Sequence, residues 1–348
     1  MSLCRNAASP ALQRERGVER FLYELLEGLF MFRRLLLAGC ASLCLFFWSP
    51  AAGAHVTLLV PSQPSIEQAP AEDTPQAADK NDKGEKQVAA PVPGGLLPAA
   101  PTEGGAPLLD KELDLLITLM RPEDHSCLDM EMPQLMSVLR FDAQTPVEQG
   151  QLMGERRDLL GDLEEIRYLD SRAWGVNVAI GKPGLYHFMI ETRPRWSESR
   201  QRYEQEFVKA TVPVYGESRG WEVPCGLRLE VVPCTRPFGL GAPCLFSAQV
   251  RWQGQPLPGA LVRMYRINTD KTPPALPTPW HCSLEARADA DGNVAFVLNR
   301  SGWWCCVAET DGEPLKGPDG NPKPLRFGGV FWLYVDDMSA APSAEKKR

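Results

Sequence analysis

Histidine is scarce in this chain, with only four among 348 residues. The sequence also lacks a phosphate-binding P-loop, an HExxH motif and any His-rich tract. A serine or cysteine nucleophile needs a nearby base, most often histidine, so acyl-transfer chemistry has no support here. The sequence therefore predicts a protein that is not an enzyme.

An excess of basic residues is missing as well. The formal net charge is −7, and Lys and Arg are scattered along the chain. Because a nucleic-acid groove needs a basic face, we expect no nucleic-acid partner. No CxxC pair occurs either, which argues against a structural zinc site.

The amino-terminal region carries an export signal. Met31 to Arg34 is a short basic stretch, Leu35 to Trp48 is apolar, and Ala52-Gly53-Ala54 supplies the small side chains that signal peptidase needs. We therefore predict that residues 1–54 are a signal region, with a true start at Met31. Cleavage after Ala54 would secrete the protein through the inner membrane into the periplasm.

Two alternatives to this cleavage stay open. The apolar run could remain as a membrane anchor, although it is short for a membrane span. The segment Leu37-Ala38-Gly39-Cys40 also resembles a lipobox, which would make the chain a lipoprotein modified at Cys40.

Most of the remaining chain predicts β-strands. In the first half, the predicted strands span 113–120, 135–141, 173–180, 184–192 and 207–214. In the last third they span 227–232, 244–252, 260–267, 282–288, 293–298, 303–309 and 329–335. The polar stretch 197–206 favours a helical turn, and alternation along its strand places His187 on the solvent side.

This spacing predicts an all-β fold of two β-sandwich-like domains, residues 108–222 and 223–337. The C-terminal domain is expected to be immunoglobulin-like, of the carboxypeptidase-regulatory type. A mature amino-terminal strand over 55–62 precedes a disordered linker over 63–107, which is rich in Pro and Ala. Residues 338–348 form a polar, disordered tail.

Seven cysteines follow the signal region. They are Cys127, Cys225, Cys234, Cys244, Cys282, Cys305 and Cys306. In an oxidising compartment this number favours disulfides, and the six between Cys225 and Cys306 allow 15 pairings. The sequence does not choose among them.

The residue after the predicted cleavage site is a candidate metal ligand. Processed there, His55 would carry a free α-amino group as well as its imidazole, a compact chelate for a metal that prefers nitrogen donors, such as Ni²⁺ or Cu²⁺. The alternative is that the cleavage site precedes a histidine by chance.

A second group of possible ligands surrounds His125. Imidazole, thiol and thioether side chains occur close together, namely those of His125, Cys127, Met130 and Met132. A nickel or copper site could use them. The alternative is a polar surface loop with two methionines in the core.

Several segments together resemble a known family. The most specific is Val232 to Leu240 (VPCTRPFGL). The others are Ala54 to Ser62, Gly184 to Phe188, Gly220-Trp221, Pro224 to Leu227, Gln253 to Ala260, Ala288 to Gly292, Ser301 to Trp304 and Gly328 to Val335. On these segments the chain resembles the NikK-type periplasmic accessory proteins of nickel and cobalt uptake, formerly labelled the NikM subunit family of the nickel transport complex.

The resemblance implies an all-β, two-part periplasmic protein that binds nickel or cobalt and delivers it to the membrane subunits of an energy-coupling-factor importer. It also favours a metal site at His55. Two nitrogen ligands of the family are absent, since Arg121 stands in place of the histidine of a His–Pro pair and Glu206 stands where members often have histidine.

The sequence and the resemblance leave two possible functions, of different classes. The first is a periplasmic nickel or cobalt uptake accessory with a site at His55, partnered by His125 and more weakly by Cys127, Met130 or Met132. The second is a metal-free periplasmic or surface β-sandwich adaptor that binds protein or glycan.

Overall fold

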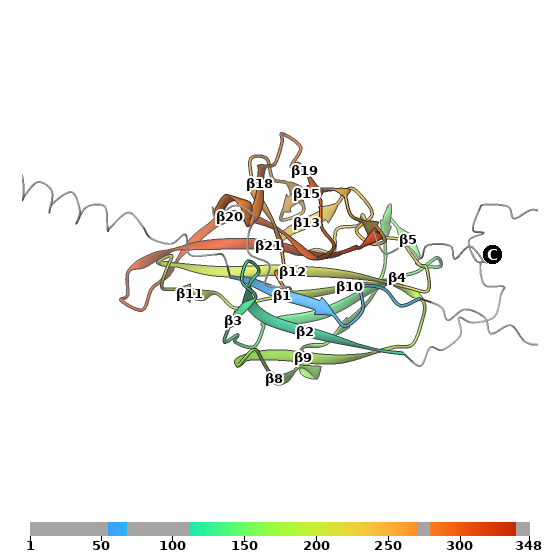
Figure 1. Ribbon diagram of the computed structural model, residues 1–348, viewed down its shortest axis with the longest axis horizontal. Helices are drawn as coiled ribbons and strands as arrows, with labels where there is room; N and C mark the ends of the chain where they lie inside the picture. The colour runs from blue at the N-terminus through green and yellow to red at the C-terminus, as the bar shows by residue number, and fades with distance from the viewer. Residues whose placement is uncertain (1–54, 68–110, 270–278, 339–348) are drawn as a thin grey trace, which may run out of the picture. The chain divides into compact units, whose positions relative to one another are not determined.

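The computed structural model describes residues 55–67, 111–269 and 279–338. The predicted signal region, Cys40, the tail after Met338 and residues 68–107 of the predicted linker lie outside the described residues. Nearly every described element is a β-strand (Figure 1), which confirms the all-β fold and its immunoglobulin-like sandwich character. In this part of the chain, no helix is long and apolar enough to cross a membrane.

The amino-terminal strand joins a five-stranded antiparallel sheet, here called the first sheet. Its order is β1-β2-β9-β8, with β3 paired to β2. Its strands are β1 (Val56–Pro61), β2 (Lys111–Arg121), β3 (Ser126–Leu128), β8 (Glu164–Tyr168) and β9 (Ser171–Ile180). Val56 pairs with Met120 and Pro61 with Leu115, so β1 runs along the apolar part of β2.

A ten-stranded sheet, here called the central sheet, connects strands from both halves of the chain (Figure 1). Its order is β18-β17-β20-β21-β12-β10-β4-β7, with β11 beside β12 and β14 beside β21. Its strands are β4 (Leu135–Phe141), β7 (Glu155–Asp158), β10 (Gly184–Glu191), β11 (Arg195–Ser197), β12 (Arg202–Val214), β14 (Leu240–Gly241), β17 (Leu261–Arg266), β18 (Ser283–Arg287), β20 (Gly302–Lys316) and β21 (Pro322–Asp336). The pairing of β12 with β21 is parallel. The predicted division into domains 108–222 and 223–337 remains a prediction.

A third sheet of four strands belongs to the last third of the chain. It contains β13 (Leu229–Pro233), β15 (Cys244–Trp252), β16 (Gln255–Pro256) and β19 (Asn293–Leu298). The remaining elements are the hairpin β5 (Val147–Glu148) and β6 (Gln151–Leu152), and the 3-10 turns η1 (Leu160–Asp162) and η2 (Pro279–His281).

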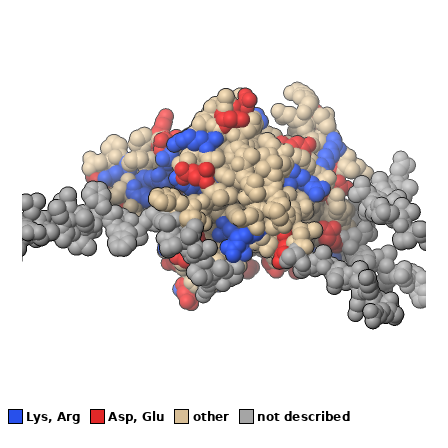
Figure 2. Space-filling model, turned by 45° about the horizontal axis from the view of Figure 1, so that its top comes forward, with Lys and Arg blue, Asp and Glu red and all other residues tan. Residues whose placement is uncertain are grey.

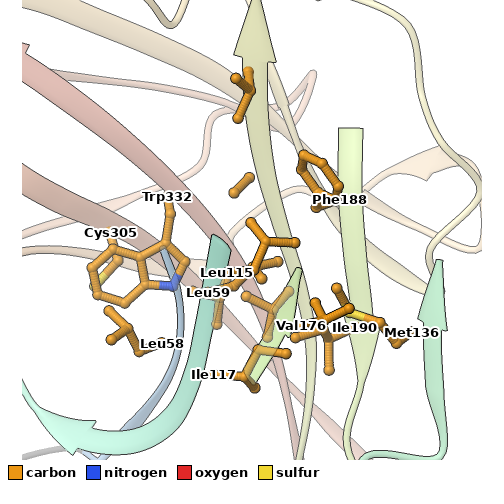
Figure 3. Packing of buried hydrophobic residues seen from close by; sticks show 14 of the residues in the cluster. Leu58, Leu59, Leu115, Ile117, Met136, Val176, Phe188, Ile190, Cys305 and Trp332 are labelled. Carbon is orange, nitrogen blue, oxygen red and sulfur yellow. The ribbon is translucent and has the colours of Figure 1, made fainter. Parts of the chain in front are cut away.

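Two hydrophobic cores hold these sheets together. The first core joins residues of the first sheet to the central sheet, and Figure 3 shows Leu58, Leu115 and Trp332 within it. The second core lies between the central and third sheets and includes Phe246 and Phe331. Successive residues of a strand point to opposite faces, so Cys305 of β20 enters the first core and Cys306 enters the second.

All seven cysteines in the described ranges are free thiols, so the expected disulfides are not formed. Cys305 and Cys306 are separated by the plane of the central sheet, and Cys225 belongs to a third, smaller cluster. The number of cysteines in the sequence does not show which core each thiol enters, because that depends on which face of the sheet the side chain lies on.

Two local predictions are wrong. The stretch 197–206 is a turn leading into β12, because Arg195 to Ser197 pair with Arg202 to Glu204 as a hairpin. His187 is completely buried. The ordered chain also extends into the predicted linker, where Ile66 is buried and bridges to Val214.

The buried His187 is neutral in the folded protein. Its Nε2–H donates to the carbonyl of Gly220 (3.1 Å), and its Nδ1 accepts from the hydroxyl of Thr211 (2.9 Å). Burial, reinforced by the charge of Lys209, lowers the pKa of His187 to about 3.

A buried ion pair anchors the loop before β13 to the central sheet. Lys209 and Glu230 are almost inaccessible and lie 2.5 Å apart. The Glu230 carboxylate also accepts from the backbone N–H groups of Cys225, Gly226 and Leu227. Each of these charges is compensated only while the other is present.

We therefore predict that Lys209→Met lowers the free energy of unfolding by about 3–5 kcal/mol, because it leaves the Glu230 carboxylate buried without its cation. Urea denaturation measures this loss. The control is Lys316→Met, at an exposed position of β20, with an expected change within about 0.5 kcal/mol. Equal effects of the two substitutions would contradict this account of the pair.

Stability should also depend on pH through His187. Its pKa is lower in the folded than in the unfolded protein, so the unfolded state binds the proton first and stability falls as the pH drops from about 6.5 towards 3. Between pH 6.5 and 4 this group contributes a loss of about 3 kcal/mol. In urea titrations across this range, His187→Gln should lose less stability on acidification than the wild type does. Parallel pH profiles would show that His187 is not responsible.

Candidate functional site

His55 is held against the central sheet, directly before β1. It is half-buried and borders a cavity of about 20 Å³, here called the His55 cavity. The charged residues lining this cavity are Arg200, Arg202, Glu204, Glu206, Arg263, Glu309 and Arg326. They come from the segment around β12 and from β17, β20 and β21, so distant parts of the sequence form the site.

Thr57, two residues after His55, is held in place by three hydrogen bonds. Its backbone N–H and its hydroxyl both donate to the Glu206 carboxylate, at 2.8 and 2.5 Å. The Trp332 indole N–H donates to the Thr57 carbonyl at 2.9 Å. We call this arrangement the Thr57 clasp. It ties β1 to β12 and β21 two residues beyond His55.

The Glu206 side chain is partly buried at the centre of the clasp. Burial raises the pKa of Glu206 to about 7, although the hydrogen bonds from Thr57 and the charge of Arg195 oppose this shift. Gly328 is the partner of Glu206 across the β12–β21 pair, and a Cβ at Gly328 would come within 3.1 Å of the Glu206 side chain. The glycine therefore leaves the room that this carboxyl occupies.

Arginine side chains dominate the surroundings of His55. The Glu204 carboxylate accepts from Arg195, Arg200 and Arg202 at 2.9 to 3.0 Å. On the neighbouring strands, Arg263 lies 2.9 Å from Glu309. The face in Figure 2 shows similar mixing, with blue basic groups directly beside red acidic ones. Three guanidinium groups share one carboxylate at Glu204, so positive charge is in excess there.

The arginines and burial keep the His55 imidazole neutral. Burial is the largest effect, and the charges of Arg121, Arg195 and Arg200 add to it, lowering the pKa of His55 to about 4. A neutral imidazole has a free nitrogen lone pair at neutral pH. It is therefore ready to coordinate a metal without first losing a proton.

His125 and Cys127 form a second group, around the turn between β2 and β3. The Nε2 of His125 lies 3.0 Å from the hydroxyl of Tyr168. Cys127 is half-buried beside the first core, and burial raises the pKa of its thiol. The lining of the His55 cavity includes neither residue.

The two predicted methionine ligands are separated by the structure. Met130 is buried and borders a cavity of about 30 Å³, whose walls include Thr57, Glu204 and Glu206. Met132 is exposed. Of the five predicted metal ligands, His55 and Met130 therefore border cavities that share two carboxylates, while His125, Cys127 and Met132 lie elsewhere.

Among the described residues, no three His, Cys, Asp or Glu side chains gather as a preformed metal site. The His55 cavity itself is lined by one imidazole, that of His55, and by the carboxyl group of Glu206. Nitrogen and carboxylate donors of this kind suit nickel and cobalt.

The prediction from sequence missed Glu204 and the arginines around it. A signal was present, because Arg193, Arg195, Arg200 and Arg202 occur within ten residues of sequence beside Glu204 and Glu206. Their spacing shows that they are charged. It does not show that the hairpin of β11 and β12 brings Arg200 and Arg202 to the His55 cavity.

A larger groove lies away from His55, on the first sheet. Its volume is about 560 Å³, and Val60, Leu116 and Ile166 line it together with the acidic Asp114 and Glu164. None of the five predicted metal ligands lines this groove.

The charge around His55 yields a direct prediction. Because the Arg200 guanidinium lowers the pKa of His55, Arg200→Gln should raise it. An NMR titration of the His55 imidazole measures this change. Arg236→Gln, in the loop after β13, is the control and should leave the titration unchanged. An unaltered pKa in Arg200→Gln would contradict this electrostatic account.

Solved structures show only distant similarity to this chain. A red sea bream transglutaminase has 10% identity and a TM-score of 0.15, over 67% of this chain and 30% of its own. The Escherichia coli alpha-2-macroglobulin has 11% identity and a TM-score of 0.15, over 64% of this chain and 13% of its own. A marsupial T cell receptor has 12% identity and a TM-score of 0.17, over 67% and 71%. This chain thus spans under a third of the first two proteins, and such low scores support no inference.

One family model matches the sequence of this chain, although no curated protein does. The family model described as a domain of unknown function, DUF4198, matches residues 112–312. That segment runs from the second residue of β2 through β19 and most of β20, and it makes up more than half of the chain. The chain therefore belongs to the DUF4198 family.

Proposed function

We propose that this protein is a periplasmic accessory of nickel or cobalt uptake, which binds the metal at the amino terminus beginning with His55 and delivers it to a membrane importer. One observation carries the proposal. The residue that follows the predicted cleavage site lies half-buried two residues before the Thr57 clasp and borders the same cavity as the Glu206 carboxyl, in place of extending freely into solvent.

The mature terminus would supply two nitrogen donors from one residue. Its imidazole is neutral at physiological pH, because burial and the nearby arginines lower the pKa of His55. The Glu206 carboxyl, which lines the same cavity, would supply an oxygen donor and release its proton as the metal binds. Nickel and cobalt accept this mixed donor set.

The resemblance to NikK-type proteins supports the same place in the structure. The family's expected ligand positions correspond here to His55, Arg121 and Glu206. Glu206 lines the cavity beside His55, and the charge of Arg121 acts on the His55 imidazole. An arginine and a glutamate replace two nitrogen donors, so the proposed site is an altered version with fewer nitrogen ligands.

Delivery requires that the metal be released as well as bound. A site with one histidine and one carboxylate holds a metal by fewer protein donors than a closed four-ligand site does. We expect an importer subunit with additional donors to remove the metal from it. The importer provides the energy for transport, and this protein contributes capture and hand-over.

Nickel titration by calorimetry tests the proposal. The protein beginning at His55 should bind one Ni²⁺ with a dissociation constant below about 1 μM. A variant with one alanine added before His55 should lose this affinity, because the imidazole then no longer carries the α-amino group beside it. The same loss is expected for His55→Ala.

Glu206→Gln separates the two kinds of donor. It keeps a carbonyl oxygen that can accept from Thr57 but removes the negative charge, so nickel binding should weaken by about ten-fold or more while the fold remains. Equal binding by the protein beginning at His55 and by its alanine-extended form would refute the terminal site. If neither form binds nickel, the metal-free adaptor becomes the better account, and the groove on the first sheet is its natural contact surface.

A further inference from the structure

We propose that the site at His55 takes its metal as an anionic chelate, bound to a small polycarboxylate, and that the surrounding arginines bind the carboxylates of that chelate. This inference rests on the proposed metal-binding function and names the chemical form of the ligand. It follows from the charge, the unsatisfied donors and the size of the His55 cavity.

The charge around His55 does not favour a bare divalent cation. Four arginines line the His55 cavity, namely Arg200, Arg202, Arg263 and Arg326. Three carboxyl groups line it as well, but one of them, Glu204, is already shared by three guanidinium groups. An incoming Ni²⁺ or Co²⁺ would meet positive charge, whereas a chelate with net negative charge would be attracted.

One guanidinium group that lines the His55 cavity, and a second whose charge acts on His55, each have an N–H group without an acceptor in the part of the chain that the structure describes. The Nε–H groups of Arg121 and Arg326 are buried and have no hydrogen-bond acceptor within the described residues. Arg326 lines the His55 cavity, and the charge of Arg121 acts on His55. Buried N–H groups without acceptors are rare and costly, so an acceptor that arrives with the ligand would relieve both.

Carboxylates are the acceptors that suit this arrangement. The planar guanidinium group presents parallel N–H donors that match the two oxygens of one carboxylate. Arg200 and Arg202 already make such charge-assisted bonds with Glu204 at 2.9 to 3.1 Å. The carboxylates of a metal chelate would offer the same bonds to Arg326 and Arg121.

The size of the cavities limits what enters them. The His55 cavity and the one beside Met130 hold about 20 and 30 Å³, enough for a water-sized group. A metal ion or one carboxylate group fits, while the carbon skeleton of the chelator would stay at the mouth. Recognition would therefore depend on the carboxylates and tolerate different chelator skeletons.

Calorimetry with preformed nickel–citrate tests the inference, using the protein that begins at His55. Free Ni²⁺, nickel–citrate and citrate alone are titrated separately. We expect nickel–citrate to bind at least about ten-fold more tightly than free Ni²⁺. Citrate alone should bind more weakly than the chelate, because it lacks the metal that His55 coordinates.

Two variants identify the arginines responsible. Arg326→Gln and Arg121→Gln should each weaken nickel–citrate binding by about ten-fold, the effect of losing a charge-assisted hydrogen bond, and should leave binding of free Ni²⁺ equal or stronger. Arg236→Gln, on the loop after β13, is the matched control and should bind both forms as the wild type does. The NMR titration of His55 shows that each variant is folded.

The outcomes separate this inference from the function on which it rests. If free Ni²⁺ binds and citrate merely weakens that binding by competing for the metal, recognition of the chelate is refuted. The proposed metal site at His55 is then still supported. If nickel binds in neither form, both are refuted. If nickel–citrate binds equally well after an alanine is added before His55, the arginines hold the anion without coordination by His55, and the inference fails.

Discussion

The parallel pairing of β12 with β21 is the constraint on which the rest of the structure depends. It joins a strand of the first half of the chain to the last strand, over the register from Tyr203 with Leu325 to Ala210 with Trp332. Both hydrophobic cores are built on the faces of the sheet that this pairing makes continuous. A parallel pair cannot be closed by a tight turn, so it forms only when distant segments meet.

The same pairing of β12 with β21 determines the geometry around His55. Glu206 lies on β12 and Trp332 on β21, and together they bind the two sides of Thr57. Opposite Glu206, Gly328 provides space because it has no side chain. The position of His55 therefore depends on contacts made by residues about 150 and 275 positions further along the chain. Under the proposed function, capture of a metal at His55 would in this way be coupled to completion of the fold.

Alternation of apolar and polar residues was sufficient to predict the strands. Leu135–Phe141, Cys244–Trp252 and Asn293–Leu298 have the predicted bounds, because period-two patterning follows directly from burial of one sheet face. His187 is an exception to this pattern. The alternating pattern placed it towards solvent, but its face is covered by the chain near Gly220, which sequence spacing does not reveal. The arginines near His55 were likewise visible as charges, while their convergence depends on tertiary structure.

The adjacent thiols of Cys305 and Cys306 have a consequence for how the protein matures. Each is fully buried in a different core, and burial raises the pKa of both, so neither is a reactive thiolate once the sheets have closed. In an oxidising compartment, the relative rates of folding and of thiol oxidation would therefore determine whether these two thiols stay reduced. A chain that folds first protects its thiols, whereas one that is oxidised first would carry a covalent link incompatible with two separate cores. Oxidant present during folding, rather than afterwards, is what would trap this protein in a misfolded state.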